Sequence, residues 1–164
     1  FDAIAAEGLA YDRCRIGVLT RFDASRHLGR NHVDTPEQAF DVLRTQVDLV
    51  LADGAAVLNA GSPELSKMAG LCDGEVIYFA RDPSLPLIAA HLEQGKRAVI
   101  VRYGQIILAS GAGEIPLARL EDVPLTEGGG NAEQTENVLA AVGAAWGLGL
   151  LPDLMRTGIE TFFE

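Results

Sequence analysis

The sequence predicts an α/β fold with three layers, in which a mostly parallel sheet is covered by helices and followed by a small antiparallel β meander. Two observations support this prediction. Short apolar runs of strand length alternate with segments of helical periodicity, in the order β, α, β, α, β, α. Two β-rich runs then follow at hairpin spacing, and two helical segments end the chain. We expect residues 1–164 to form a single domain.

The composition argues against several classes of function. The chain has 164 residues, is 48% hydrophobic and carries a formal net charge of −10. Because it contains no Lys/Arg-rich run, we expect no nucleic-acid partner. No segment approaches the roughly 18 consecutive apolar residues of a membrane span, and the N-terminus lacks a secretion signal, so we expect a cytoplasmic protein with no membrane partner. Cys14 and Cys72 are expected to be reduced core thiols.

The first third of the chain is predicted to contain two helices and one strand. Residues 2–9 have helical spacing, and the apolar run 16–20 has strand length. Residues 21–34 are polar, hold two of the three histidines and are predicted to form a loop at the end of this strand, where chemistry is expected. The next helix begins with the cap Thr35-Pro36 and ends at Asp53-Gly54. Its apolar face is expected to contain Phe40, Leu43, Val47 and Val50.

A central strand is predicted over residues 54–58, where small apolar residues end abruptly in the polar sequence Asn-Ala-Gly-Ser-Pro. A buried strand whose carboxyl end opens into a polar loop and then a helix marks the edge at which open α/β sheets bind ligands. The alternative is a core strand followed by an ordinary turn, and this stretch taken alone favours that alternative.

The remaining elements follow from the same two periodicities. The predicted helices lie at 65–71, 86–93, 133–148 and after Pro152, and the predicted strands at 75–79, 97–101, 105–109 and 115–120. The segment 127–130 is expected to be flexible and exposed. Trp146 is expected in the core, His32 and His91 at the surface or on a helix face, and Arg97, Arg102 and Arg119 on a solvated face.

A series of motifs spans nearly the whole chain. In order, they are GLAYDRC, IGVLT, RHLG, the TPEQ helix start, AAVLNA followed by Pro, GEVIYFARDP, IPLARLEDVPLT, ENVLAAVGAAWGLGL and GIETF. Their order resembles that of the cyanophycin synthetase family, and more specifically the second half of its Mur-ligase-like central domain. The resemblance implies a three-layer Mur-ligase-type sheet with helices, in a partial domain from which the P-loop half and the C-terminal ligase domain are absent.

The resemblance implies an ATP-dependent amide ligase that adds arginine to the β-carboxyl group of aspartate on a polyaspartate backbone. Such ligases activate the carboxylate as an acyl phosphate, with ATP and Mg²⁺ as cofactors. The Gly-rich phosphate loop of the family is absent from this sequence and is expected upstream of it, so the chain alone is expected to be inactive. The implied partners are ATP, the rest of the ligase and further copies of the chain.

The resemblance assigns four candidate site residues and no catalytic residue. His27 matches a histidine expected to help hold Mg²⁺, and Asn137 in ENVLAA matches an amide expected to face the adenine. Asn59 and Ser62 lie in the loop expected to contact the nucleotide, where the family has an acid that accepts hydrogen bonds from the ribose. The alternatives are structural: Asn137 can satisfy backbone groups in an N-terminal helical turn, and Asn59 can cap its loop.

Several positions depart from the family pattern. Arg21 and Arg26 place positive charge beside the expected magnesium site, and Leu43 stands where the family has a lysine that can bind metal. Gly61 and Ser62 replace two acids. The sequence therefore favours a segment of a cyanophycin-synthetase-like ligase that is catalytically incomplete or degenerate.

Two other classes of function stay open. One is an active ligase that carries its phosphate loop elsewhere on the native polypeptide and recruits metal ligands from other positions. The other is a non-catalytic assembly or regulatory module that contacts a partner through the exposed meander at 97–120. We also expect self-association, because half of a Mur-type domain exposes sheet surface.

Overall fold

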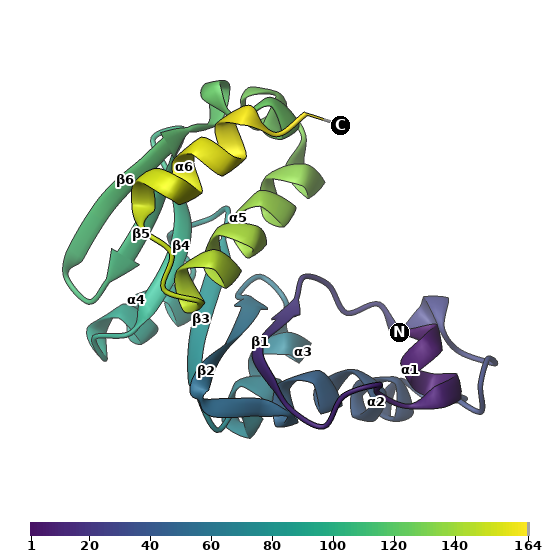
Figure 1. Cartoon of the computed structure of the whole chain (residues 1–164). Coiled ribbons are helices and arrows are strands. Elements are labelled where there is room, and N and C mark those ends of the chain that lie inside the picture. The colour runs from purple at the N-terminus through teal and green to yellow at the C-terminus, as the bar shows by residue number, and fades with distance from the viewer. Residues whose placement is uncertain (164) are drawn as a thin grey trace.

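The computed structural model describes residues 1–163, which contain one six-stranded sheet (Figure 1). Its strands lie side by side in chain order: β1 (Cys14–Leu19), β2 (Val50–Asn59), β3 (Glu75–Ala80), β4 (Arg97–Arg102), β5 (Gln105–Ser110) and β6 (Gly113–Arg119). Strands β1 to β4 are parallel, whereas β5 and β6 run antiparallel to their neighbours. The predicted α/β fold and its antiparallel meander are confirmed.

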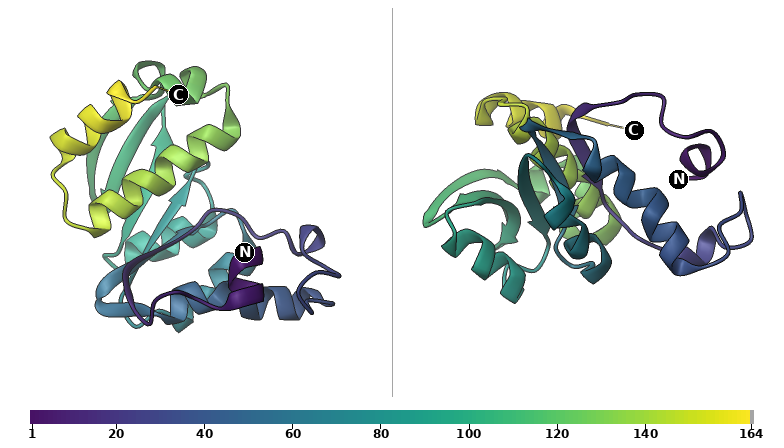
Figure 2. Two further views of the ribbon diagram at one scale, coloured as in Figure 1. Left: turned by 45° about the vertical axis from the view of Figure 1, so that its right-hand side comes forward. Right: turned by 90° about the horizontal axis from the view of Figure 1, so that it is seen from below.

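Helices cover both faces of the sheet and give a structure of three layers (Figure 2). The helices are α1 (Asp2–Glu7), α2 (Pro36–Asp48), α3 (Pro63–Met68), α4 (Pro86–Glu93), α5 (Ala132–Gly147) and α6 (Pro152–Thr161). Helices α2, α3 and α4 pack on one face, and α5 and α6 pack on the other. Short 3-10 helices lie in the connections at Ala24–Arg26, Ala69–Leu71, Leu120–Asp122 and Pro124–Gly129.

Strand β2 contributes side chains to the hydrophobic core on both faces of the sheet. Ala56 and Leu58 pack into the layer of α2 and α3, whereas Ala55 and Val57 pack into the layer of α5. All four side chains are buried. Because side chains alternate along a strand, burial of both faces requires an uninterrupted apolar run, which is the pattern from which this strand was predicted.

Two glycines let α5 lie close to the sheet. A Cβ atom at Gly143 would be 2.7 Å from Val57 Cγ1, and one at Gly147 would be 2.8 Å from Ile16 Cδ1. Either contact would force the helix or the strand to move, since protein interiors are close-packed. The glycines therefore fix the height of α5 above β1 and β2, and with it the position of the side chains that α5 contributes to the candidate site.

The start of β2 differs from the prediction. Helix α2 ends at Asp48, and Val50, expected on its apolar face, is the buried first residue of β2. The pairing of β1 with β2 is irregular along this segment. A Cβ atom at Gly54 would be only 2.2 Å from Arg15 O. The helix end predicted at Gly54 was wrong, because this glycine allows two strands to approach each other.

The antiparallel meander continues the main sheet and is not a separate appendage. Strand β4 pairs with β3 in parallel register and with β5 in antiparallel register. The turn between β4 and β5 consists of Tyr103 and Gly104, whose φ angles are 51° and 72°. Glycine adopts such angles freely, whereas tyrosine rarely does. Tyr103 is also 96% exposed, so its ring makes little contact with the rest of the described chain.

His91, predicted at the surface or on a helix face, and Arg97, predicted on a solvated face, both have partners inside the structure. His91 on α4 is buried, and its Nε2 lies 3.0 Å from Val76 O and 3.1 Å from Arg97 O. The half-buried side chain of Arg97 donates from Nε to Glu75 Oε1 at 2.8 Å, and its guanidinium lies 4.9 Å from the ring centre of Trp146. His91 therefore fits the helix-face alternative, on the buried face of α4. The solvated face expected for Arg97 was wrong, because groups at the amino end of β3 and in α5 bind its side chain.

The expectations for the two cysteines, His32, Arg119 and Trp146 agree with the structure. Cys14 and Cys72 are free thiols. His32 and Arg119 are exposed, and Trp146 packs against the core on the side of α5. Within residues 1–163, none of the helices combines the length and the apolar character that crossing a membrane requires.

Candidate functional site

The carboxyl ends of β1 and β2 border a polar pocket of about 330 Å³. The loops that follow these strands, the first turn of α3 and one residue of α5 contribute to it. Its lining residues are Thr20, Arg21, Phe22, Asn59, Gly61, Ser62, Pro63, Glu64 and Glu136. This is the edge at which open α/β sheets bind ligands, so the structure has a pocket where the sequence predicted a site.

The side chain of Asn59 shapes this pocket from the end of β2. Its Oδ1 accepts a hydrogen bond from Gly61 N at 2.9 Å, and its Nδ2 donates to Thr20 O at 3.1 Å. The same Nδ2 lies 3.3 Å from Glu136 Oε2. These contacts make Asn59 the residue that holds its loop, which was the structural alternative to direct nucleotide contact.

Ser62 has a similar local role at the start of α3. Its hydroxyl caps the helix by accepting a hydrogen bond from Leu65 N at 3.5 Å, and it donates to Glu64 Oε2 at 3.2 Å. Such a cap satisfies one of the free N–H groups of the first turn. The hydroxyl therefore brings the carboxylate of Glu64 into the pocket wall.

Arg21 lines the same pocket from the loop after β1. Its Nη2 lies 3.3 Å from Glu133 Oε1 in the first turn of α5. The two side chains are 47% and 66% exposed, so solvent screens the pair and it contributes at most about 1 kcal/mol to stability. The pair nevertheless joins the β1 loop to α5 beside the pocket.

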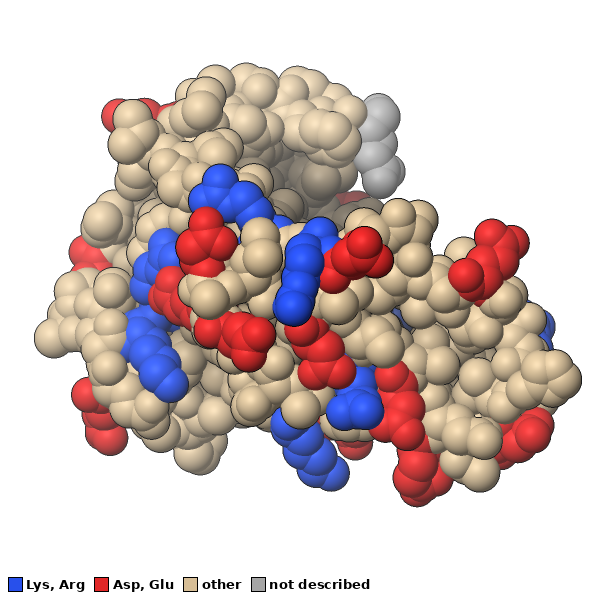
Figure 3. Space-filling model, turned by 60° about the horizontal axis from the view of Figure 1, so that its bottom comes forward, with Lys and Arg blue, Asp and Glu red and all other residues tan. Residues whose placement is uncertain are grey.

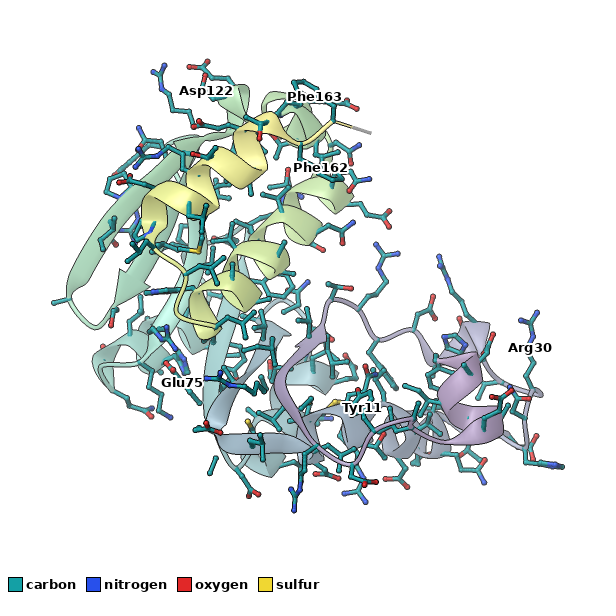
Figure 4. The ribbon with its side chains drawn as sticks, in the orientation of Figure 1. Tyr11, Arg30, Glu75, Asp122, Phe162 and Phe163 are labelled. Carbon is teal, nitrogen blue, oxygen red and sulfur yellow. The ribbon has the colours of Figure 1, made fainter. Side chains whose placement is uncertain are left out.

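Asn137 follows Glu136 in the chain but faces a second pocket. This pocket has a volume of about 270 Å³ and a mostly apolar lining, formed by Leu125, Asn137, Val138, Ala141, Gly158, Ile159 and Phe162. Figure 4 labels Phe162, which lies at the end of α6.

The amide of Asn137 does not cap a helix. Its Nδ2 donates to Gln134 Oε1 at 3.2 Å, on the exposed surface of α5. The cap of α5 is Asn131, which accepts a hydrogen bond from Gln134 N at 3.1 Å. The capping role offered as the alternative for Asn137 therefore belongs to Asn131. Asn137 instead places a polar group at the rim of an apolar pocket.

Comparison with known proteins shows which proteins this chain is similar to. No protein-family model matches the chain. Curated relatives from Synechocystis sp., Crocosphaera subtropica and Geminocystis herdmanii, each named cyanophycin synthetase, are 33%, 34% and 33% identical over 159 residues, which is 97% of this chain. The chain matches one segment of cyanophycin synthetase. It spans 18% of the length of these relatives.

The cyanophycin synthetase resemblance predicted a metal ligand at His27. In the structure, His27 Nδ1 lies 3.0 Å from Asp2 Oδ1, and its ring stacks on Phe1 with the centroids 3.9 Å apart. Leu43 is buried and lines the same pocket as His27. Among residues 1–163, no group of three or more His, Cys, Asp or Glu side chains is arranged to hold a metal ion. The described residues do not by themselves make up a magnesium site, and the role of His27 stays a prediction.

The structure distributes the residues predicted from cyanophycin synthetase over three pockets. Asn59 and Ser62 share the polar pocket at the end of β2, Asn137 lines the apolar pocket beside α6, and His27 lines a third pocket that shares the β1 loop with the first. Their roles as nucleotide and metal ligands stay predictions.

Sequence reasoning missed the two carboxylates of the polar pocket. Glu64 and Glu136 both line it and are half-buried. Glu136 stands directly before Asn137 at the start of an otherwise small and apolar helical segment, which was an available signal. No separate signal pointed to Glu64, because its position depends on the hydrogen bond from Ser62.

Proposed function

We propose that the chain is a segment of a cyanophycin-synthetase-like, ATP-dependent amide ligase and that it supplies one side of the nucleotide site. The observation that carries the proposal is the identity of 33% to 34% over 97% of the chain. In the complete ligase, as the resemblance implies, arginine would be joined to the side-chain carboxyl groups of aspartate on a polyaspartate backbone.

The apolar pocket between α5 and α6 fits a purine base. Val138 and Ile159 offer apolar surface for the faces of the ring, and the amide of Asn137 can donate to and accept from the nitrogen atoms of its edge. A mostly apolar wall with one oriented polar group is typical of sites for small planar ligands. We therefore assign adenine recognition to this pocket.

Asn59 and Ser62 contribute by shaping the neighbouring polar pocket. Their hydrogen bonds fix the loop between β2 and α3 and hold two carboxylates in its wall. Bound ATP would supply the phosphoryl group that activates a carboxylate for attack by an amine. We assign no step to Mg²⁺, because the donor groups of the described residues do not make up a metal site.

We further propose that the chain is part of a larger Mur-ligase-like central domain and is catalytically incomplete by itself. Arg21 and Leu43 occupy positions at which the resemblance expects metal-binding chemistry. A guanidinium paired with Glu133 and a buried leucine provide no oxygen ligand for a hard cation. On this basis we expect nucleotide binding without turnover.

A second candidate function is a non-catalytic assembly module that uses the meander. Tyr103 at the tip of the β4–β5 hairpin is 96% exposed, and Ile115 on the edge strand β6 is 49% exposed. Exposed apolar side chains at a sheet edge favour association with another chain. Light scattering over a range of concentrations tests this candidate, and a strict monomer, alone and mixed with a full-length synthetase, contradicts it.

The charge distribution bears on the partner of such a module. On the face drawn in Figure 3, Lys and Arg side chains stand among Asp and Glu and form no continuous basic patch. Neutralising a phosphate backbone needs clustered cations, so this face offers no site for nucleic acid. A protein partner is the expectation.

A thermal-shift titration with Mg²⁺ and ATP tests the nucleotide-binding proposal. It should be made on this chain and on any longer native polypeptide that contains it. A ligand at about 100 times its dissociation constant stabilises the native state by about 2.7 kcal/mol, which gives a clear shift of the midpoint. A shift supports the proposal, and arginine-dependent ATP hydrolysis then measures turnover. No shift in either protein contradicts it.

A further inference from the structure

The third pocket, at the carboxyl end of β1, contains hydrogen-bond donors that the chain leaves unused. It has a volume of about 250 Å³, and its lining includes Thr20, Arg21 and Gln46. Thr20 and Gln46 are half-buried. Among residues 1–163, neither the hydroxyl group of Thr20 nor the side-chain amide of Gln46 forms a hydrogen bond. Both groups are therefore available to donate to a ligand in the pocket.

Arg21 gives the wall of this pocket a positive charge. Its pair with Glu133 is exposed on both sides and involves Nη2, so other N–H donors of the guanidinium stay available. The described lining contains one carboxylate, that of Asp23. This carboxylate already accepts a hydrogen bond from Ser25 at 2.6 Å and pairs with Arg26 at 2.9 Å. The unused groups of the pocket are therefore mainly donors, and one of them is a cation.

The pocket lies where the cyanophycin synthetase resemblance places a magnesium ion, yet its residues do not suit a metal. Hard divalent cations bind through carboxylate and water oxygens. Leu43 offers no ligand, and the guanidinium of Arg21 repels a divalent cation. His27 retains a single ring nitrogen, because its Nδ1 faces Asp2. This nitrogen does not make a metal site by itself.

We propose that the third pocket binds an oxyanion directly, with the guanidinium of Arg21 in the place of a metal ion. A phosphate or a carboxylate presents several acceptor oxygens, which match the donors of Arg21, Thr20 and Gln46. A guanidinium can bind such a group through two parallel N–H bonds, and these charge-assisted bonds are stronger than neutral ones. Because a fixed side chain supplies the positive charge, the anion is held without Mg²⁺. In this respect the chain departs from what the resemblance implies.

The inference goes beyond the proposed function and does not depend on nucleotide binding. The pocket shares Thr20, Arg21 and Phe22 with the polar pocket at the end of β2, so an anion bound here lies beside that pocket. The anion can be a phosphoryl group or the carboxylate of a second ligand. Both share the chemistry of the proposed site, and the experiment distinguishes between them.

NMR titration of the ¹⁵N-labelled chain with sodium phosphate and with sodium acetate tests the proposal. Sodium chloride keeps the ionic strength constant, and EDTA removes divalent ions. We expect saturable shifts of the amide signals of Thr20, Arg21 and Phe22. Replacing EDTA by Mg²⁺ should change the dissociation constant by less than about twofold. Tighter binding of phosphate identifies a phosphoryl group as the ligand, and tighter binding of acetate identifies a carboxylate.

Three variants test which side chains hold the anion. Arg21→Gln should weaken binding about tenfold or more, because a neutral donor replaces a charged one. Gln46→Ala should weaken binding about threefold to tenfold through the loss of one hydrogen bond. Arg15→Gln is the matched control, since Arg15 is exposed on β1 and does not line the pocket. It removes the same charge from the chain and should bind the anion as the unmodified chain does.

Three results would overturn the proposal. The absence of saturable shifts at the pocket with either salt shows that no oxyanion site exists there. Shifts that occur only with Mg²⁺ show that a metal ion is needed to hold the anion. Equal weakening in Arg21→Gln and Arg15→Gln shows an effect of net charge and not of a contact. The comparison of EDTA with Mg²⁺ uses the unmodified chain and does not depend on the folding of any variant.

Discussion

Asn59 Nδ2 lies 3.3 Å from Glu136 Oε2, so the end of β2 is joined to α5 across the candidate site. The same side chain bonds Thr20 O at the end of β1 and Gly61 N in the loop before α3. One buried amide thus connects the elements that form the polar pocket. The shape of this pocket depends on Asn59 even where Asn59 touches no ligand.

Replacing Asn59 should destabilise the fold. Asn59→Ala leaves Thr20 O and Gly61 N without partners in a part-buried setting, and we expect a loss of about 2 to 3 kcal/mol. Asn59→Asp keeps an acceptor for Gly61 N but places a second carboxylate beside Glu136, so it should also destabilise. Urea denaturation measures both. Asn137→Ala is the matched control, and an equal loss in that variant would contradict this role.

The close packing of α5 can be tested with a pair of glycine variants. Gly143→Ala would bring its Cβ to 2.7 Å from Val57 Cγ1, and we expect a loss of about 1 to 3 kcal/mol. Gly158→Ala in α6 meets no atom within 4 Å and should stabilise by up to about 1 kcal/mol through helix propensity. Thermal unfolding measures the expected loss of stability in Gly143→Ala and the expected gain in Gly158→Ala. A neutral Gly143→Ala would show that α5 is not held by this contact.

Stability should fall in mild acid because of His91. Burial is the main cause that lowers the pKa of His91 below its usual value, and the charge of Lys96 lowers it further. The hydrogen bonds to the carbonyls of Val76 and Arg97 and the charge of Glu75 oppose this lowering. In the unfolded chain, where the pKa of His91 is about 6.5, the imidazole therefore takes up a proton more readily than in the native state. The stability that neutral His91 contributes is fully present above the pKa of this side chain in the unfolded chain. It is lost as the pH falls from that value through the lower pKa of the native state.

Denaturation at a series of pH values between about 5 and 7.5 measures this effect. The unmodified chain should lose stability towards the acid end, and His91→Gln should show a smaller dependence on pH over that range. His32→Gln, at an exposed position, is the control and should follow the unmodified chain. Identical pH profiles for all three proteins would contradict the assignment.

Asn137 should affect nucleotide binding without affecting stability. The side chain of Asn137 is exposed and its one hydrogen bond among the described residues is to the half-buried side chain of Gln134, so Asn137→Ala should change the free energy of unfolding by less than about 0.5 kcal/mol. Loss of the polar group at the rim of the pocket should weaken ATP binding about tenfold. Calorimetry measures the ATP affinity of Asn137→Ala and that of the control Gln94→Ala. Gln94 is exposed and lines neither the apolar pocket nor the polar pocket. Equal ATP affinities of the two variants would contradict a role for Asn137 in nucleotide binding.

Much of the fold could be predicted because burial leaves a direct pattern in the sequence. The run 55–58 predicted a strand buried on both faces, and its pairing on both sides is in the structure. The start of β2 escaped prediction because Leu51, Ala52 and Asp53 do not alternate as a half-buried strand should. There Val50 pairs with Cys14 of β1 before the register shifts, and a local pattern does not reveal such a long-range pairing.

The candidate site was only partly predictable for a different reason. Asn59, Ser62 and Asn137 lie where strand ends and helix starts could be recognised. The partners of His91 and the positions of the carboxylates of Glu64 and Glu136 result from contacts between segments far apart in the chain or from the geometry of one turn. Such contacts are fixed by packing and carry no periodic signal.

Photolabelling with 8-azido-ATP followed by peptide mapping tests the central claim most directly, namely that the pocket between α5 and α6 binds adenine. We predict labelling confined to peptides that contain Leu125, Val138 or Ile159, protection by excess ATP and a reduced yield in Asn137→Ala. Labelling that ATP does not prevent, or ATP-protected labelling outside the lining of this pocket, would contradict the claim.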